Sequence, residues 1–258
     1  MTPIHPTAVV DPGAKLADDV TIGPYAVIGG DVELRAGVSV AAHCVVSGPT
    51  LVGEGTRIFP SCVIGTEPQI IGSDGGTTRL EIGRDNVIRE FAVIHVGSER
   101  GGDCTRIGDG NFILNNVHVA HDCQIGSHCV LASFSALAGH VNLQDHVVFG
   151  AMTGVHQFVR IGESVFTGAN SMISKDAPPF TKVVGDRARF AGLNTIGLER
   201  RGFPHDVVAA LKHAYHVLFQ SKLLLAVALA RVEDESGHVP EVARVLEFLR
   251  EAGRGFIR

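Results

Sequence analysis

Aliphatic residues recur at every sixth position through most of this sequence. From Val10 to Ile94, fourteen of the fifteen positions spaced six apart are aliphatic. The phase then shifts by one residue, and the pattern resumes from Ile107 to Ile173, where eleven of twelve such positions are apolar. A period of six fits neither the period of a helix nor the alternation of an ordinary strand. It is typical of hexapeptide repeats, in which a short strand and a turn form one side of a triangular coil.

Small residues form a second column, four positions after each aliphatic residue. This column includes Cys44, Cys62, Cys123 and Cys129, which we expect to be buried small side chains where the wall bends. Three hexads complete a coil of eighteen residues, so the repeats predict about nine stacked coils and a prism about 43 Å tall. Each coil buries its apolar column against its neighbours, so the array is one cooperative unit.

Two segments interrupt the repeat. Residues 66–80 keep the phase but contain a glycine-rich stretch from Gly72 to Gly76, and residues 95–106 contain the phase shift and a glycine pair. We expect each segment to leave the wall as a loop. Long loops on a rigid scaffold often carry function.

The repeat fades after Ile173, and residues 180–202 are expected to be irregular. A helical spacing of apolar residues then begins near Pro204, a residue that suits a first helical turn. Two further helices are expected over residues 223–232 and 242–249. The predicted organisation is an all-β solenoid, a parallel β-helix, over residues 1–190 and a C-terminal α-helical domain over residues 191–258.

Composition narrows the functional class. The 258 residues carry a net charge of −5, which argues against a nucleic-acid-binding protein. No stretch approaches the ~20 apolar residues of a membrane span, and the N-terminus does not resemble a signal peptide. Five cysteines without a CxxC spacing suit a reducing compartment. We therefore expect a cytoplasmic protein without an integral membrane segment.

Stacking of the coils predicts a histidine-rich patch. Residues eighteen apart lie directly above one another, so His121 is expected under Gly139 and Asp122 under His140. The same face gathers further polar side chains from neighbouring coils. They are His118, His156 and Gln157. For His128 and His146, which lie elsewhere on the coils, we expect only solvated side chains.

Two kinds of chemistry suit this patch. A neutral imidazole at His121 can act as a general base, with Asp122 to orient it and the N–H of Gly139 to stabilise an oxyanion. No activated serine or cysteine accompanies it, which favours direct transfer without a covalent intermediate. Alternatively, His118, His121 and His140 could bind Zn²⁺, as in gamma-class carbonic anhydrases. We favour the general base, without a metal or cofactor.

Four longer segments resemble one particular family. They are Asn116 to Cys123, Leu137 to Val141, Met152 to Phe158 and Gly197 to Phe203. They are similar to the acyl-carrier-protein–UDP-N-acetylglucosamine O-acyltransferases, and the similarity runs along the whole chain. The resemblance implies a left-handed β-helix and a homotrimer with an active site between two prisms. It implies transfer of a 3-hydroxyacyl chain from acyl carrier protein to the 3-position of the UDP-sugar, the first step of lipid A biosynthesis.

The resemblance also assigns roles to residues. It makes His121 the general base, Asp122 its partner and Gly139 the oxyanion-hole glycine. It implies binding of substrate, nucleotide or phosphopantetheine by Gln69, Arg79, His95, His118, His140, His156, Gln157, Asn194, Arg200 and Arg201. Because acyl carrier protein is acidic, Arg200, Arg201 and Lys212 form a candidate docking patch.

The sequence departs from the family pattern at two places. Family members have Gln-Asp-Leu-Lys where this chain has Gln69 to Gly72, so the aspartate beside the acceptor and the lysine near the phosphates are replaced by Ile70 and Gly72. We therefore consider the 3-amino analogue of the sugar, which would yield an amide, as an alternative acceptor. Ala169 lies where family members that transfer fourteen-carbon chains have glycine. The resemblance makes this residue the acyl-chain ruler, and its added methyl group predicts a shorter chain.

Other functions remain open from the sequence. The chain could be another hexapeptide acyltransferase, although the later N-acyltransferase of lipid A synthesis has an additional N-terminal domain. Coenzyme A-dependent acetyltransferases are also relatives. A scaffold that binds a sugar nucleotide without catalysis is the non-enzymatic alternative, and the pair of His121 and Asp122 argues against it.

Overall fold

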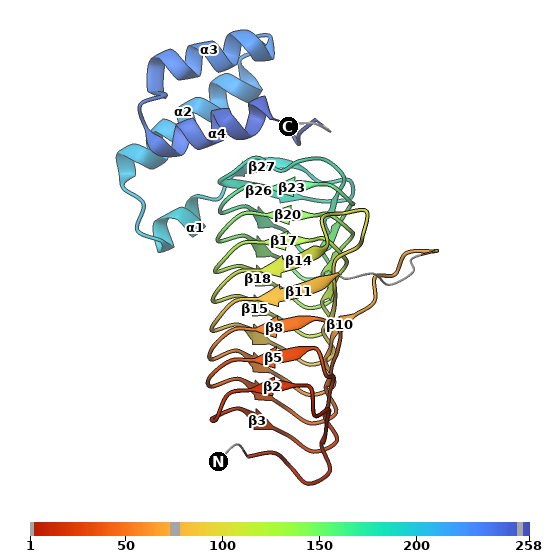
Figure 1. The fold of residues 1–258 in the computed structure, drawn as a ribbon. Coiled ribbons are helices and arrows are strands. Elements are labelled where there is room, and N and C mark those ends of the chain that lie inside the picture. The colour runs from red at the N-terminus through yellow and green to blue at the C-terminus, as the bar shows by residue number, and fades with distance from the viewer. Residues whose placement is uncertain (1–2, 73–77, 252–254) are drawn as a thin grey trace.

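A tall prism of short parallel strands forms most of the molecule, and helices lie at its C-terminal end (Figure 1). The computed structural model describes residues 3–72, 78–251 and 255–258. The N-terminus lies at the opposite end of the prism from the helices (Figure 1). Among the described residues, no helix is both long and apolar enough to cross a lipid bilayer.

The chain visits three sheets in turn, and these form the faces of the prism. Face 1 contains β1 (Val9–Val10), β4 (Val27–Ile28), β7 (Val45–Val46), β10 (Val63–Thr66), β13 (Val93–His95), β16 (His118–Val119), β19 (Ala136–Leu137), β22 (Gly154–Val155) and β25 (Met172–Ile173). Face 2 contains β2 (Lys15–Leu16), β5 (Val32–Leu34), β8 (Thr50–Val52), β11 (Arg79–Ile82), β14 (Cys104–Ile107), β17 (Gln124–Ile125), β20 (Asn142–Leu143) and β23 (Arg160–Ile161). Face 3 contains β3 (Thr21–Ile22), β6 (Ser39–Val40), β9 (Arg57–Ile58), β12 (Val87–Ile88), β15 (Phe112–Ile113), β18 (Val130–Leu131), β21 (Val148–Phe149), β24 (Phe166–Thr167), β26 (Thr181–Val184) and β27 (Arg189–Leu193).

The strands stack in the predicted register. His118 pairs with Ala136, and Ala136 pairs with Gly154, which is the expected step of eighteen residues. The aliphatic column fills the interior, because residues such as Ile113, Leu131 and Ile161 have no exposed surface. The prediction of a parallel β-helix of hexapeptide coils is confirmed.

The predicted cysteine column is also confirmed. Cys44, Cys62, Cys123 and Cys129 are buried free thiols. Burial raises the pKa of Cys123 and of Cys129 to about 12. Cys123 and Cys129 are therefore unreactive core groups at neutral pH.

Residues in left-handed backbone conformation turn the chain at the corners of the prism. We call the corners 1–2, 2–3 and 3–1 after the faces that they join. At corner 1–2, Asp122, His140 and Phe158 stand one above another with φ values of 60°, 61° and 65°. Such values are uncommon outside glycine, so the surrounding coils must hold these residues in place.

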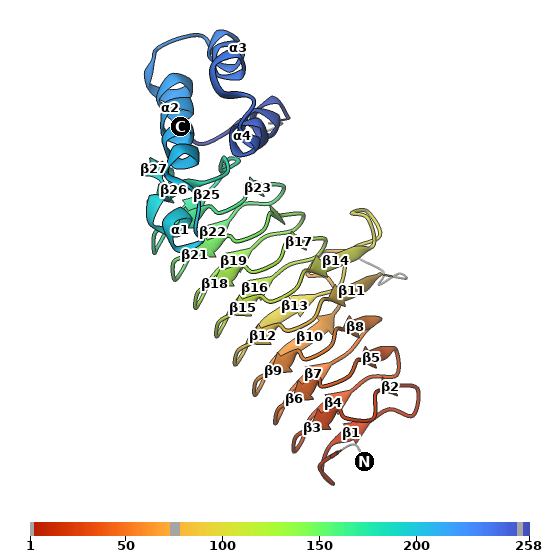
Figure 2. The same cartoon turned by 90° about the vertical axis from the view of Figure 1, so that its left-hand side faces the viewer.

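Both predicted loops leave the prism at corner 1–2. The first joins β10 to β11, so Val63 pairs with Val93 instead of a residue eighteen positions on. The second joins β13 to β14, and Val93 pairs with His118. After the second loop the eighteen-residue step returns, and the strands of face 1 continue as one stack (Figure 2). Residues 73–77 of the first loop lie outside the described residues, so its glycine-rich tip is not described.

The segment of residues 180–202 is not irregular, and that prediction was wrong. It forms β26, β27 and a short helix, α1 (Thr195–Arg200), with β26 and β27 paired antiparallel. These elements are too short to show a clear period in the sequence. The strand β27 runs across the expected domain boundary between residues 190 and 191.

The predicted helices begin at Pro204 and pack into a second core. They are α2 (His205–Gln220), α3 (Leu225–Ser236) and α4 (Pro240–Arg250). Their buried faces meet around Leu211, Val232 and Leu246, and Phe180 from the prism joins the same cluster. The helical core is therefore continuous with the last turns of the prism.

Candidate active site

His121 and Asp122 occupy corner 1–2 between β16 and β17, and their side chains are paired. The distance from His121 Nδ1 to Asp122 Oδ2 is 2.7 Å. The Asp122 side chain is 1% exposed, whereas that of His121 is 14% exposed. An ionised carboxylate can only accept hydrogen bonds, so Nδ1 of His121 donates and Nε2 carries the lone pair. The ring is thus fixed in the tautomer that a general base requires.

Ser98, from the second loop, holds the Asp122 carboxylate on its other side. Its backbone N–H donates to Oδ1 at 2.9 Å, and its hydroxyl donates to Oδ2 at 2.5 Å. The backbone N–H of Asp122 donates to Thr105 Oγ1 at 2.8 Å. Sequence analysis missed Ser98 and Thr105, because nothing in the repeat places loop residues over a particular coil. The only signal was their position in the loop that contains the phase shift.

A glycine lets the same loop close over the carboxylate. A Cβ atom at Gly101 would lie 2.1 Å from Asp122 Oδ2 and 2.4 Å from His140 Cε1. A residue with a side chain would therefore force the loop away from Asp122. The covered carboxylate is shielded from water, which strengthens its interaction with His121.

Gly139 lies against the ring of His121, as the stacking predicted. A Cβ atom at Gly139 would lie 2.4 Å from Cε1 and 2.6 Å from Nε2 of His121. The residue is buried, and its N–H makes no hydrogen bond to another described residue. A free donor therefore lies beside the lone pair of the base.

Further histidines surround this pair. His140 stands at right angles to His121, with ring centroids 5.1 Å apart, and stacks on Phe158 at 4.4 Å. His118 meets the edge of His95 at 5.2 Å. Burial lowers the pKa of His140 and of His118 below the ordinary value of a histidine. Neutral rings are therefore favoured around the base, and these can accept hydrogen bonds from a substrate.

His95 carries an unsatisfied acceptor. Its Nδ1 lies 2.7 Å from the carbonyl oxygen of Glu67, so Nδ1 donates and Nε2 holds a lone pair. Nε2 is buried and has no hydrogen-bond partner among the described residues. A pocket of about 590 Å³ adjoins His95 and includes Gln69. A ligand with a donor group would satisfy His95 there.

An apolar groove on face 1 begins beside the histidines. It has a volume of about 520 Å³, with His118 and His156 among its walls. Its other walls come from successive coils, and Asp186 and Arg187 lie at its far end. These walls are Ala136, Leu137, Ala138, Gly154, Val155, Met172, Ile173 and Ser174. Gln157, next to His156, is exposed. The groove can hold a hydrocarbon chain.

The remaining predicted residues lie elsewhere. Asn194, Arg200 and Arg201 line a pocket of about 650 Å³ at corner 2–3. Arg79 lies on face 2, where its side chain pairs with Glu81 at 2.7 Å. Ala169 is exposed between β24 and β25, at corner 3–1.

The pocket at corner 2–3 contains two histidines that we expected only to be solvated. His128 and His146 stack with centroids 5.1 Å apart and line this pocket with Arg200, Arg201 and Lys182. Lys182, Arg200 and Arg201 supply the positive charge of this site, whereas burial lowers the pKa of His146 and favours its neutral ring. Anions such as phosphates suit this site.

His121, Asp122 and His140 could also be considered as metal ligands, because one atom of each lies within 4.8 Å of the others. However, His121 Nδ1 and Asp122 Oδ2 are only 2.7 Å apart. Two ligands around one tetrahedral zinc ion, each at about 2.0 Å from it, stand about 3.3 Å apart. The observed distance is that of a hydrogen bond, so the residues as placed do not fit Zn²⁺. His118 pairs with His95 and is not part of this group.

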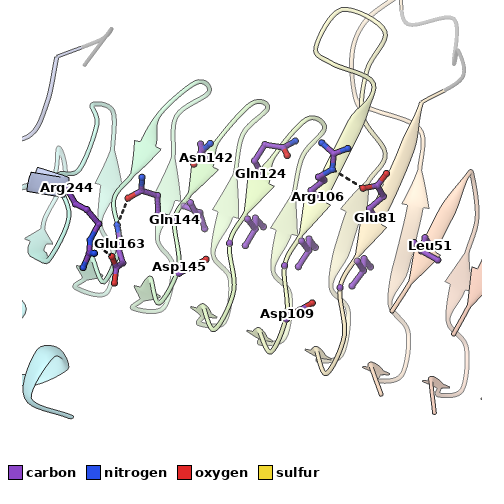
Figure 3. Close-up of a pocket in the computed structure, with 17 residues that line it drawn as sticks. Leu51, Glu81, Arg106, Asp109, Gln124, Asn142, Gln144, Asp145, Glu163 and Arg244 are labelled. Atoms are coloured by element: carbon purple, nitrogen blue, oxygen red, sulfur yellow. Dashed lines mark hydrogen bonds and ion pairs between the residues drawn. The ribbon is translucent and has the colours of Figure 1, made fainter. Parts of the chain in front are cut away.

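A larger groove on face 2 has a different character (Figure 3). It measures about 740 Å³, and its polar side chains largely satisfy each other. Arg106 pairs with Glu81 at 2.9 Å, and Glu163 pairs with Arg244 at 3.1 Å. Gln144 accepts a hydrogen bond from the N–H of Glu163. We interpret this face as a structural surface.

Fold and site together define a transferase of the hexapeptide-repeat class. Two family models match the chain. "Bacterial transferase hexapeptide (six repeats)" covers residues 13–48 and 104–139, and "Udp N-acetylglucosamine O-acyltransferase; Domain 2" covers residues 176–257.

Curated relatives are more specific. Proteins of Thiobacillus denitrificans and Alkalilimnicola ehrlichii are each 50% identical over 258 residues, which is 100% of both chains in each comparison. Both are named acyl-[acyl-carrier-protein]–UDP-N-acetylglucosamine O-acyltransferase. The chain belongs to this family of enzymes.

Solved structures of enzymes from this family have the same fold as this chain. LpxA from Acinetobacter baumannii matches with a TM-score of 0.96 and 37% identity, over 99% of each chain. The UDP-N-acetylglucosamine acyltransferase of Francisella novicida matches with a TM-score of 0.96 and 33% identity, over 99% of this chain and 94% of the other. The predicted left-handed parallel β-helix with C-terminal helices is confirmed.

Proposed function

We propose that this enzyme moves a 3-hydroxyacyl chain from acyl carrier protein to the 3-hydroxyl group of UDP-N-acetylglucosamine, the first step of lipid A biosynthesis. The observation that carries the proposal is the arrangement of His121, Asp122 and Gly139. The lone pair of His121 Nε2 lies beside the free N–H of Gly139, and the buried carboxylate of Asp122 holds the His121 ring in place. Full-length relatives named for this activity support the same reaction.

The geometry suggests a direct transfer. His121 Nε2 removes the proton of the sugar hydroxyl as its oxygen attacks the thioester carbonyl. The N–H of Gly139 stabilises the oxyanion of the tetrahedral intermediate, and Asp122 stabilises the imidazolium. When the intermediate collapses, the C–S bond breaks and the thiolate of the pantetheine arm takes the proton back from His121. These steps use only side chains, backbone and the two substrates, so we propose no cofactor.

The site is divided between chains in this proposal. His121 lies at corner 1–2, whereas the basic pocket of Asn194, Arg200 and Arg201 lies at corner 2–3 of the same prism. Two neighbouring prisms can bring these corners together around one substrate. We therefore assign the basic pocket to the nucleotide or the donor, and the complete enzyme to a homotrimer in the cytoplasm.

Corner 3–1 supports self-association. Tyr25, Phe91, Phe134 and Met152 stand there with more than half of their surface exposed. All four have φ near 60°, a strained conformation that presents large apolar side chains to the outside. A column of exposed apolar groups indicates a surface that another chain covers.

The names of the relatives favour the 3-hydroxyl group over the 3-amino group as the acceptor. These relatives are named O-acyltransferases, although this chain has Ile70 and Gly72 in the loop. The lone pair on His95 Nε2 can accept a hydrogen bond from the sugar and so replace part of the lost polarity. We therefore prefer the ester product over the amide.

The experiment offers 3-hydroxyacyl carrier proteins of several lengths with UDP-N-acetylglucosamine or its 3-amino analogue, and identifies products by mass spectrometry. An alkali-labile ester on the hydroxyl sugar is expected, with chains shorter than fourteen carbons because of Ala169. His121→Ala should remove nearly all activity while the oligomer persists. An alkali-stable amide formed only on the amino sugar would overturn the acceptor, and full activity of His121→Ala would overturn the mechanism.

A further inference from the structure

A small basic pocket lies at the helical end of the prism. It measures about 250 Å³ and contains four basic side chains, with no acidic residue in its lining. The basic residues are Lys175, Arg187, Arg189 and Arg258. Ala188, Phe256 and Ile257 supply apolar walls. We call these residues the end pocket.

The four cations of the end pocket have no counter-ion within the described parts of the chain. None of them forms an ion pair there, and neither Asp186 nor the terminal carboxyl group is paired with them. By contrast, nearby Arg160 is saturated by Asp176, Glu251 and a backbone carbonyl. Gathering like charges without a partner is unfavourable, so an anionic ligand would relieve the repulsion.

Lys175 of the end pocket stands on the same corner as the base, and Arg187 also lies at the far end of the apolar groove on face 1. His121, Gly139, Gln157 and Lys175 follow one another at steps of eighteen residues along corner 1–2, with paired strands beside them on face 1. Three steps between coils span roughly 14 Å. The pocket therefore lies about that distance from the reacting atoms, on a straight path along the prism.

That separation matches one part of the acyl donor. From sulfur to phosphorus, a pantetheine arm has about thirteen bonds and extends to about 16 Å, at roughly 3.8 Å for every three bonds. We propose that the end pocket binds the phosphodiester that joins the pantetheine arm to the carrier protein. This inference rests on the proposed function, because it takes the thioester to be at His121.

A second source of phosphate is the nucleotide sugar. The pocket at corner 2–3 already provides Arg200, Arg201 and Lys182 for a diphosphate, and it lies on a different corner from His121. Lys175 of the end pocket shares its corner with the base and with the exposed Gln157. We therefore assign the donor's phosphodiester, and not the nucleotide, to the end pocket.

The test compares three donors that carry the same acyl chain. These are the acylated carrier protein, acyl-phosphopantetheine and acyl-pantetheine, which lacks the phosphate. In the double variant Lys175→Gln, Arg189→Gln, the KM for the two phosphorylated donors should rise about tenfold, the effect of two exposed charge contacts. The KM for acyl-pantetheine and for the UDP-sugar should stay unchanged. The variant Lys15→Gln, Arg35→Gln removes the same charge at the far end of the prism and should change none of these values.

A direct binding measurement separates this proposal from the proposed function. Phosphopantetheine without an acyl chain should bind the wild-type protein more tightly than pantetheine does, and the double variant should lose the difference. If the end pocket binds the phosphodiester, the double variant should lose this difference in affinity and still transfer acyl chains. Absence of acyl transfer in the wild-type protein would instead refute the proposed function. Equal effects on the phosphorylated and unphosphorylated donors, or a rise in the KM for the UDP-sugar alone, would overturn the inference.

Discussion

Gly139 presents a bare Cα to the face of the His121 ring, and a methyl group has no room there. We predict that Gly139→Ala pushes the ring away from the oxyanion position. The kcat should fall by about 10²–10³-fold, the effect of losing one oxyanion donor, with little change in KM. Steady-state kinetics measures this. Gly29→Ala, whose added Cβ would meet its nearest neighbour at an ordinary 3.4 Å, serves as the control. Unchanged kcat in Gly139→Ala would remove Gly139 from the mechanism.

Two of the histidines with lowered pKa, His118 and His140, lie near His121 and make stability depend on pH. His118 and His140 bind a proton less readily in the folded chain than in the unfolded one, because burial disfavours their charged forms. The unfolded state therefore takes up more protons as the pH falls below about 6.5, and stability decreases. We predict that His118→Asn, His140→Asn lowers this loss between pH 7 and pH 5, measured as the denaturant midpoint. His5→Asn, at an exposed residue, should not alter the slope, and an unaltered slope in the double variant would contradict the prediction.

Residues of the site differ in how far the sequence could predict them. The stacking of His121 under Gly139 follows from an eighteen-residue period, because strand pairing fixes what lies one coil above. Ser98 and Gly101 could not be placed, since a loop closes over the site through side-chain hydrogen bonds and close approach rather than through a repeat. The basic pocket around His128 was also missed, because its cations Lys182, Arg200 and Arg201 lie more than fifty residues further along the chain.

At the scale of elements, one carboxylate ties the helices to the prism. Glu163, just after β23, pairs with Arg201 at the end of α1 at 3.2 Å and with Arg244 of α4 at 3.1 Å. Arg201 also donates to Ser164. The Glu163 side chain is only 17% exposed, so this network is partly protected from solvent. Figure 3 shows Glu163 between Arg244 and Gln144.

We predict that Glu163→Gln costs about 1–2 kcal/mol of stability, equivalent to a fall in Tm of roughly 2–8 °C. Because Arg201 then loses its anchor, the KM for the UDP-sugar should also rise while kcat changes little. Calorimetry and kinetics measure the two effects. Glu251→Gln is the matched control, since Glu251 pairs with Arg160 but is 63% exposed. A Tm equal to that of the control would show that the tie contributes nothing.

Elements were predictable where the pattern was long. The coils and the helices after Pro204 show a period over many residues, and the structure has them. The hairpin of β26 and β27 and the short helix α1 were missed, because neither spans enough positions for a period to stand out. Their form depends on tertiary contacts, such as Asn194, which caps α1 by accepting a hydrogen bond from Gly197.

At the scale of the whole molecule, the division of the site predicts complementation between inactive chains. His121→Ala leaves the basic pocket intact, and Arg200→Glu leaves the base intact. Co-assembled, the two variants form some sites with His121 from one chain and Arg200 from the next. We predict that the mixture regains activity that neither variant has alone, measured after co-expression or after refolding together.

A variant that cannot form the oligomer also tests whether the active site is divided between two chains. Phe134→Lys, Met152→Lys puts charges on corner 3–1, and we expect monomers in sedimentation analysis and loss of activity. Active monomers, or mixtures as inactive as their components, would place the whole site within one chain. The variant Lys15→Gln, at an exposed position of β2 on face 2, should leave the oligomer unchanged.

The two loops at corner 1–2 also bear on how such enzymes diversify. Each loop inserts extra residues between paired coils, and the register resumes on the next turn as though nothing had been added. An insertion or deletion there leaves the alignment of His121 with Gly139 intact, because that alignment depends only on the coils above. Evolution can therefore change the substrate-facing loops, as at Ile70 in this chain, while the alignment of His121 with Gly139 is kept.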